Sequence, residues 1–140
     1  MYANGAIGAA VLRRDGFAGM VADAEGELLT RPLVFSGSHL FVNAECRFGS
    51  VAVEVLDADR RVIPGFARTD CAAFVRADST KTELRWKGAA LADLKGREVS
   101  FRFLIRSATL YSFWISASAR GESGGYVAGG GPAYSGPRDL

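Results

Sequence analysis

The sequence predicts an all-β domain: an antiparallel β-sandwich, jelly-roll-like, with about eight or nine strands. Three observations lead to this prediction. Apolar and polar residues alternate with a period of two along much of the chain, turn-forming residues separate these stretches, and no long stretch has the 3.6-residue period of a helix. The length of 140 residues fits one domain covering residues 1–140.

The clearest strand lies between residues 97 and 106. Val99, Phe101 and Phe103 fall on one face and Arg102 on the other, which is the pattern of a half-buried strand. A single helical turn is expected at residues 91–94, where the alternation stops. The other predicted strands cover residues 7–13, 17–22, 28–35, 39–45, 49–57, 62–63, 81–87 and 109–116.

The apolar faces of these strands predict one hydrophobic core. Hydrophobic residues make up 49% of the chain and charged residues 23%, which are values of an ordinary globular domain. Residues 121–140 are rich in Gly, Ser and Pro and predict an irregular tail. The side chains expected to be largely buried are Val53, Val55, Val99, Phe101, Phe103, Tyr111, Phe113 and Ile115.

Charge and cysteine content argue against several classes of function. The net charge is +2 and the basic residues are spread out, so neither a nucleic acid nor a membrane surface is an expected partner. We expect no signal peptide, since the opening residues lack a basic segment, and the location stays open, with a secreted parent as one alternative. Cys46 and Cys71 fit no zinc pattern, so two buried thiols are expected, with a disulfide as the alternative.

Catalytic motifs are weak in this sequence. Residues 121–125 match G-x-S-x-G around Ser123, but the glycine-rich segment that follows will not form the helix of a nucleophile elbow. His39 is the only histidine and precedes this serine, so we expect it to be a packing or surface residue. No catalytic, cofactor-binding or metal-binding residue is therefore predicted.

Aspartates near predicted turns are the remaining chemical candidates. We expect them to bond backbone amides or arginines, and in particular we predict a structural polar network that pairs Asp15 with Arg31. Two alternatives stay open, namely a carboxylate pair of a small glycoside hydrolase and a structural calcium site. The aspartates in question are Asp15, Asp57, Asp59, Asp70 and Asp78.

Four aromatic residues could form a carbohydrate-binding surface, because sugar rings stack on flat aromatic faces. These candidates are Trp86, Trp114, Tyr126 and Tyr134. Trp114 is out of phase with Phe113 and Ile115, so we expect it to pack beneath the tail or a loop rather than to share their face.

Several segments together resemble the C-terminal domain of bacterial proteins of the glycosyl hydrolase family 32 type, which carry a five-bladed β-propeller in front. The resemblance covers nearly the whole chain, although none of the segments is a catalytic signature. They are residues 7–17 (IGAAVLRRDGF), 29–32 (LTRP), 40–43 (LFVN), 53–57 (VEVLD), 63–66 (IPGF), 70–71 (DC), 78–79 (DS), 86–88 (WKG) and 110–114 (LYSFW).

The resemblance implies a non-catalytic accessory domain that provides stability or docks on a catalytic β-propeller. The catalytic carboxylates would belong to the propeller, and residues 1–6 would be a remnant of its last strand. A carbohydrate-binding module is the first alternative function, and a small glycoside hydrolase is the second.

The resemblance also leads us to expect an apolar face meant to be covered by a partner. In its absence we expect a weak homodimer through the N-terminal strand or the surface beside it. The side chains expected at this face are Tyr2, Ile7, Val11 and Leu12, joined by Tyr126 and Tyr134.

Overall fold

The computed structural model describes residues 5–126 and 136–140, and within them the chain forms a single curled antiparallel sheet. Six strands make up this sheet, in the order β4-β3-β6-β2-β5, with β1 also paired to β6. The strands are β1 (Met20–Leu29), β2 (His39–Glu45), β3 (Ser50–Leu56), β4 (Phe74–Val75), β5 (Asp78–Leu84) and β6 (Ser100–Ser116).

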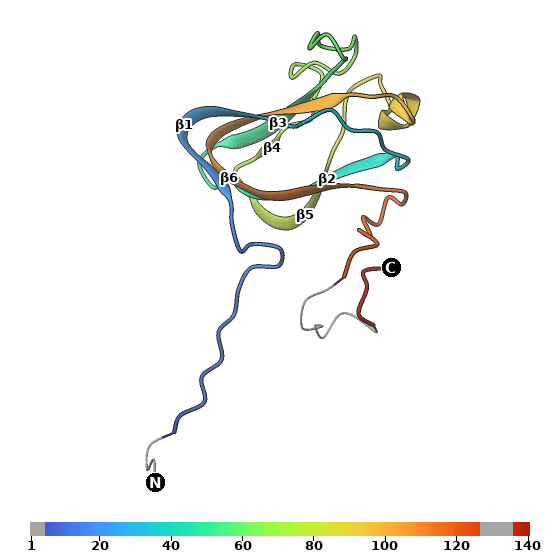
Figure 1. Cartoon of the computed structure of the whole chain (residues 1–140). Coiled ribbons are helices and arrows are strands. Elements are labelled where there is room, and N and C mark those ends of the chain that lie inside the picture. Colours follow the sequence, from blue (N-terminus) through green and yellow to red (C-terminus); the bar gives the residue numbers. More distant parts are fainter. Residues whose placement is uncertain (1–4, 127–135) are drawn as a thin grey trace.

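The long strand β6 organises the sheet. Its first half pairs with β3 and its second half with β2, so β2 and β3 follow one another along the same edge of β6. Strand β1 pairs with residues 102–110 along the opposite edge. In Figure 1, β6 turns back on itself so that β3 lies above and β2 and β5 lie below, giving the sheet the shape of a half-barrel.

The curl arises where β6 bends between Arg106 and Ala108. Ser107 has a φ of 42°, in the left-handed region. Opposite the bend, the backbone of Gly49 approaches so closely that a Cβ there would lie 1.7 Å from the carbonyl oxygen of Arg106. Only glycine fits at this position, and register shifts in β1 and β2 help the sheet to curve.

The core lies on the inner side of this bend. Val53, Val55, Phe101 and Phe103 are fully buried, as predicted, and Val99 is 1% exposed. The prediction is only partly met in the second half of β6, where Tyr111, Phe113 and Ile115 are half-buried. Phe113 still packs on the core, with its ring centroid 4.9 Å from that of Phe103.

The expectation of eight or nine strands is wrong for the residues that the structure describes, which contain six. The two strands predicted at 97–106 and 109–116 are one strand, because β6 bends without breaking its pairing. Regular pairing of the predicted strand 28–35 ends at Leu29, and only an isolated bridge between Leu33 and Val99 continues it; Pro32, between them, has no amide hydrogen to donate. Residues 7–13 form no strand either.

Other predicted elements are confirmed or moved. Strand β2 has the predicted bounds, β3 and β5 lie close to theirs, and one 3₁₀ turn, η1 (Leu91–Leu94), lies at the predicted position. Strand β1 includes residues 22–27, which have low strand propensity, yet Ala22 and residues 25–27 pair with β6 on either side of a register shift. Cross-strand pairing therefore outweighs local propensity here.

Candidate functional site

The surface beside the bend carries two exposed apolar side chains, Val21 and Phe48, which we call the Val21–Phe48 site. They flank a depression of about 320 Å³. Val21 on β1 is 68% exposed, and Phe48 in the turn between β2 and β3 is 91% exposed. The other lining residues are Asp23, Glu45, Arg47, Ser107, Ala108 and Thr109.

Sheet register places the strand residues of this site side by side. Thr109 of β6 lies opposite Val21 of β1 on one edge and opposite Glu45 of β2 on the other. Side chains directly opposite one another share a face of the sheet. The row of three therefore forms the floor of the depression on the outer face.

The turn of residues 46–49 presents Phe48 to solvent. Cys46 is buried, and its amide donates to the carbonyl of Ala77 at 2.8 Å. The amide of Gly49 donates back to the Cys46 carbonyl at 3.2 Å, and Gly49 is pressed against β6. With both ends of the turn held against the sheet, the Phe48 side chain remains outside.

Charged groups surround the apolar pair. Arg47 Nε lies 2.9 Å from Glu45 Oε1, and its terminal nitrogen lies 3.8 Å from Asp78 Oδ2. The Ser107 hydroxyl donates to the carbonyl oxygen of Asp23 at 3.0 Å. Exposed apolar side chains next to charged ones are a combination that protein interfaces use.

A polar network anchors the N-terminal segment next to this surface, and we call it the Arg13–Asn43 clamp. Arg13 Nε donates to Asn43 Oδ1 at 2.5 Å, and the Asn43 amide donates to the Arg14 carbonyl at 2.5 Å. Arg13 also donates to the carbonyl of Ala44 and pairs with Asp78. Asn43 is fully buried, so the clamp depends on a polar group inside β2.

The network predicted between Asp15 and Arg31 takes a different form. The Asp15 side chain is 57% exposed and its carboxylate lies 3.4 Å from Arg14 Nε. Arg31 is exposed on the segment after β1. The neighbouring Arg13 and Arg14 make the buried contacts instead, because the turn that contains Asp15 directs its carboxylate outward.

The three predicted sugar-binding aromatics that lie within the described residues are not gathered on one surface. Trp86 is 7% exposed, lies edge-on to Phe66 and donates from Nε1 to the Val53 carbonyl at 3.1 Å. Trp114 is half-buried, stacks on Phe41 and donates to the Gly121 carbonyl at 3.0 Å, so it does pack beneath the start of the tail. Tyr134 lies outside the described residues.

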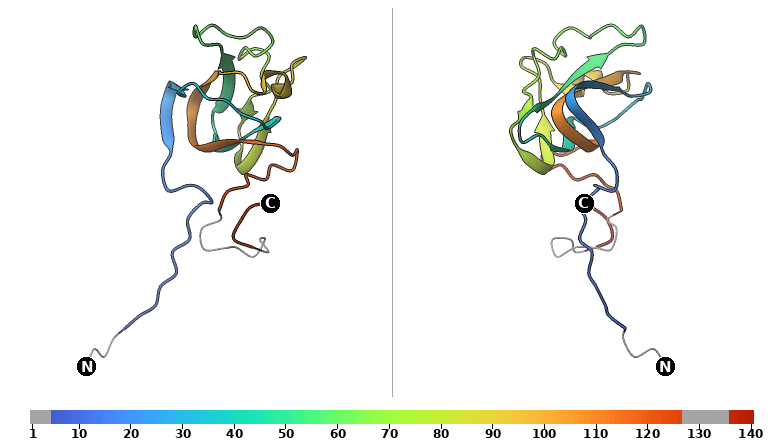
Figure 2. Two further views of the ribbon diagram at one scale, coloured as in Figure 1. Left: turned by 45° about the vertical axis from the view of Figure 1, so that its right-hand side comes forward. Right: turned by 90° about the vertical axis from the view of Figure 1, so that its left-hand side faces the viewer.

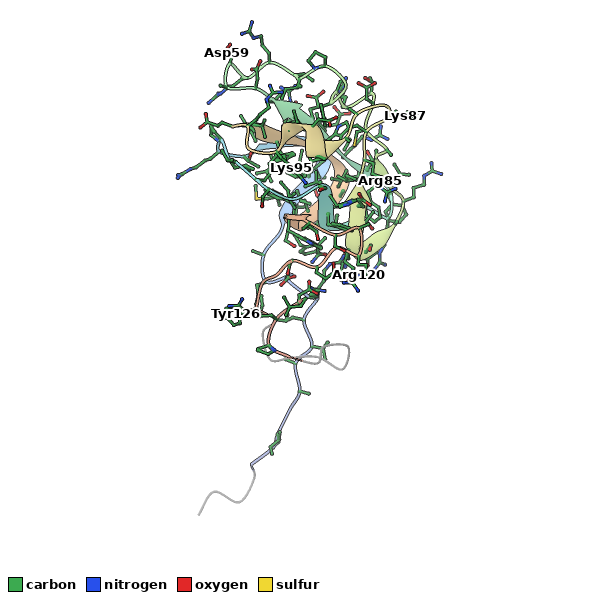
Figure 3. All side chains as sticks on the ribbon, turned by 90° about the vertical axis from the view of Figure 1, so that its right-hand side faces the viewer. Asp59, Arg85, Lys87, Lys95, Arg120 and Tyr126 are labelled. Atoms are coloured by element: carbon green, nitrogen blue, oxygen red, sulfur yellow. The ribbon has the colours of Figure 1, made fainter. Side chains whose placement is uncertain are left out.

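Tyr126 is the exposed member of the set. It is 76% exposed and lies on the tail, away from the sheet, as Figure 3 shows. Arg138 lies over its ring at 4.6 Å and donates to its hydroxyl at 2.9 Å. One aromatic ring therefore remains open to a ligand here, with a guanidinium already on one face.

The weak catalytic motifs have structural partners. Nδ1 of His39 lies 2.7 Å from Oε1 of Glu83, across the β2–β5 pair. The Ser123 hydroxyl accepts a hydrogen bond from the Gly125 amide at 3.2 Å, which makes the G-x-S-x-G segment a local turn. Cys46 and Cys71 are both free and buried.

A second groove, of about 470 Å³, lies on the outer face of β1, β6 and β3. Glu25 and Glu27 line it from one strand, while Arg68 and Arg106 line it from other elements. The two glutamates are two residues apart on β1 and so share one side of the groove. Glycosidase carboxylates flank the scissile bond, so this is not their arrangement.

Phe48 was missed by sequence reasoning, although the sequence holds a signal for it. An aromatic residue in a short turn between two predicted strands has no core face to occupy, so its exposure follows from the strand bounds alone. Val21 lies in a strand whose pairing partner could not be read from the pattern, and its exposure was not predictable.

These observations define an all-β antiparallel domain with an apolar-centred surface site and a clamped N-terminal segment. Comparison of the chain with protein-family models, with curated proteins and with solved structures finds no match. In the described part of the chain, no cluster of His, Cys, Asp or Glu could hold a metal ion. No helix among the same residues has the length and apolar character needed to span a membrane.

Proposed function

We propose that this chain is a non-catalytic accessory domain that docks on the catalytic β-propeller of a glycoside hydrolase. The observation that supports this proposal is the Val21–Phe48 site, where an aromatic side chain stands 91% exposed beside the charged side chains of Glu45 and Arg47. The sequence resemblance supplies the partner. We also propose that, in the parent protein, the domain has the jelly-roll-like β-sandwich fold that the resemblance to the family 32-type proteins implies.

The pKa values of two carboxylates, Glu83 and Asp139, support a structural role for these groups. Burial opposes ionisation of Glu83, but hydrogen bonds from Arg85 and His39 outweigh it and hold the pKa of Glu83 below its usual value. Burial likewise opposes ionisation of Asp139, and the Ser123 amide and the Arg14 guanidinium lower its pKa overall. A general acid needs a raised pKa, so these groups are suited to ion pairing rather than to proton donation.

Binding in trans tests the docking proposal. The family 32-type propeller of the same parent protein is expressed separately and titrated with this domain. We expect saturable binding that Phe48→Asp weakens at least about tenfold, since a buried charge would replace the central anchor. The matched control is Val34→Asp, at a valine that is 61% exposed on the segment before β2. Unaltered binding by the Phe48 variant would rule out the site.

Carbohydrate binding is the second candidate, supported by the exposed ring of Tyr126. A panel of neutral oligosaccharides titrated against the domain, with Tyr126→Ala as the comparison, distinguishes the two. If the domain binds a sugar and Tyr126→Ala abolishes that binding, a carbohydrate-binding module is favoured over a docking domain. The same purified domain should release no sugar from fructans or aryl glycosides, and activity lost on replacing one Asp or Glu would instead support a hydrolase.

A further inference from the structure

The N-terminal segment before the clamp is an extended apolar stretch that forms no strand. Its residues are all glycine or apolar, residues 5–12 are all exposed, and Figures 1 and 2 show them projecting away from the sheet in every view. Ile7 is 105% exposed, Val11 93% and Leu12 61%. We call residues 5–12 the N-terminal arm.

The second half of β6 offers an unpaired edge. Pairing with β1 ends at Leu110, while β2 continues along the other edge to Ser116. Among the described residues, no strand pairs with 111–116 on the β1 side. An unpaired strand edge is a template for strand addition.

The side chains of β6 are less buried in the half that lacks a second neighbouring strand. In its first half, flanked by strands on both edges, Phe101 and Phe103 are fully buried. In its second half, with one edge open, Phe113 and Ile115 are only half-buried although they continue the same apolar pattern. A missing neighbouring strand accounts for the difference.

The arm fits this edge in length and chemistry. At roughly 3.3 Å per residue, residues 5–12 span about 26 Å and residues 111–116 about 20 Å. The arm carries no charged residue and no proline, so nothing in it opposes strand pairing. A depression of about 390 Å³, lined partly by Ile115 and Leu140, lies at the far end of the edge and could receive an apolar arm side chain.

The clamp decides which molecule receives the arm. Arg13 and Arg14 are fixed to Asn43, Ala44 and Asp139, which holds the base of the arm while the arm itself leaves the body of its own chain. The chain's own edge is left open at the same time. Exchange of identical segments between two copies covers the arm and pairs the open edge of β6. A two-fold exchange gives a closed dimer rather than a fibre.

We propose that the N-terminal arm of one chain adds as a strand to the 111–116 edge of β6 in a second copy, and reciprocally. The exchange gives each chain the neighbour that its β6 edge lacks and covers the apolar side chains of the arm. It goes beyond the proposed docking function and does not involve the Val21–Phe48 site.

Sedimentation velocity over a concentration series tests the exchange, with the full chain, Val11→Lys and the control Val34→Lys. Both valines are exposed, so neither substitution should unfold the domain. We expect the full chain and Val34→Lys to dimerise over the same concentration range and Val11→Lys to stay monomeric. Hydrogen exchange should show that the amides of residues 111–116 that point away from β2 are protected in the dimer and open in Val11→Lys, while those that face β2 are protected in both.

Three results would overturn the exchange. They are a monomer at every concentration, a dimer that Val11→Lys leaves intact, and protection at monomer concentrations of the 111–116 amides that point away from β2, which would mean that the arm folds on its own chain. Each is distinct from failure of docking, because Phe48→Asp should leave dimerisation unchanged while it weakens propeller binding.

Discussion

Replacing Asn43 by alanine should destabilise the domain by breaking the Arg13–Asn43 clamp. The Asn43 side chain is fully buried and holds two partners, accepting from Arg13 Nε and donating to the Arg14 carbonyl. Both bonds connect the turn before β1 to the interior of β2. Their loss therefore affects the fold and the base of the N-terminal arm together.

The magnitude follows from the two bonds. A hydrogen bond to a charged group contributes about 1.5–3 kcal/mol, and a neutral one about 0.5–1.5 kcal/mol. The Arg13 side chain is 19% exposed, so water replaces part of the lost contact. We expect the free energy of unfolding to fall by about 2–3 kcal/mol.

Urea unfolding followed by tryptophan fluorescence measures this change, because Trp86 reports on the core. The slope of the transition should stay the same and the midpoint should fall. Val34→Ala, at an exposed position, should change stability by less than about 0.5 kcal/mol. If Asn43→Ala changed the free energy of unfolding as little as Val34→Ala does, the clamp would not anchor the N-terminal segment.

Three further predictions follow from burial and ionisation. Phe103→Ala should lower the free energy of unfolding by about 3–5 kcal/mol in denaturant titrations, since its ring is fully buried, and a loss below about 1 kcal/mol would refute the core assignment. The lowered pKa values of Glu83 and Asp139 mean that their contribution is present above the unfolded pKa values and is lost as pH falls through the folded ones; melting temperature should therefore drop on acidification below about pH 4.5, less steeply in Asp139→Asn, and equal slopes would count against this. Burial raises the pKa of Cys71, opposed by a backbone hydrogen bond at Val53, so Cys71 and the buried Cys46 should react with a thiol reagent only after unfolding, and prompt labelling of the native protein would contradict their burial.

The alternation of residues was enough to predict the strands whose two faces differ clearly. Strands β2 and β3 and the first half of β6 were found this way, together with their buried side chains Val53 and Phe101. The bend was not predictable, because it depends on the contact between Gly49 and β6, which are far apart in the sequence. Because the bend was not foreseen, the sequence pattern predicted two strands where β6 is a single one.

The candidate site was less accessible from the sequence. Aromatic content pointed to Trp86 and Trp114, but a tryptophan that donates a hydrogen bond from within the core has the same sequence signature as one that faces a ligand. Asp15 was expected to pair with Arg31 in a polar network. Its positive φ of 48° places it in a tight turn instead, and the arginines before it form the clamp.

Thiol labelling at position 48 tests the central claim, that the Val21–Phe48 site is covered by a catalytic propeller. The native cysteines are buried and should give little background. Phe48→Cys is labelled in this domain alone and in a fusion of the domain to a family 32-type β-propeller, the partner that we propose, with Val34→Cys as the control. The account predicts fast labelling of Cys at position 48 in the isolated domain, strong protection in the joined protein, and no change at position 34. Equal labelling rates at position 48 in both proteins would contradict it.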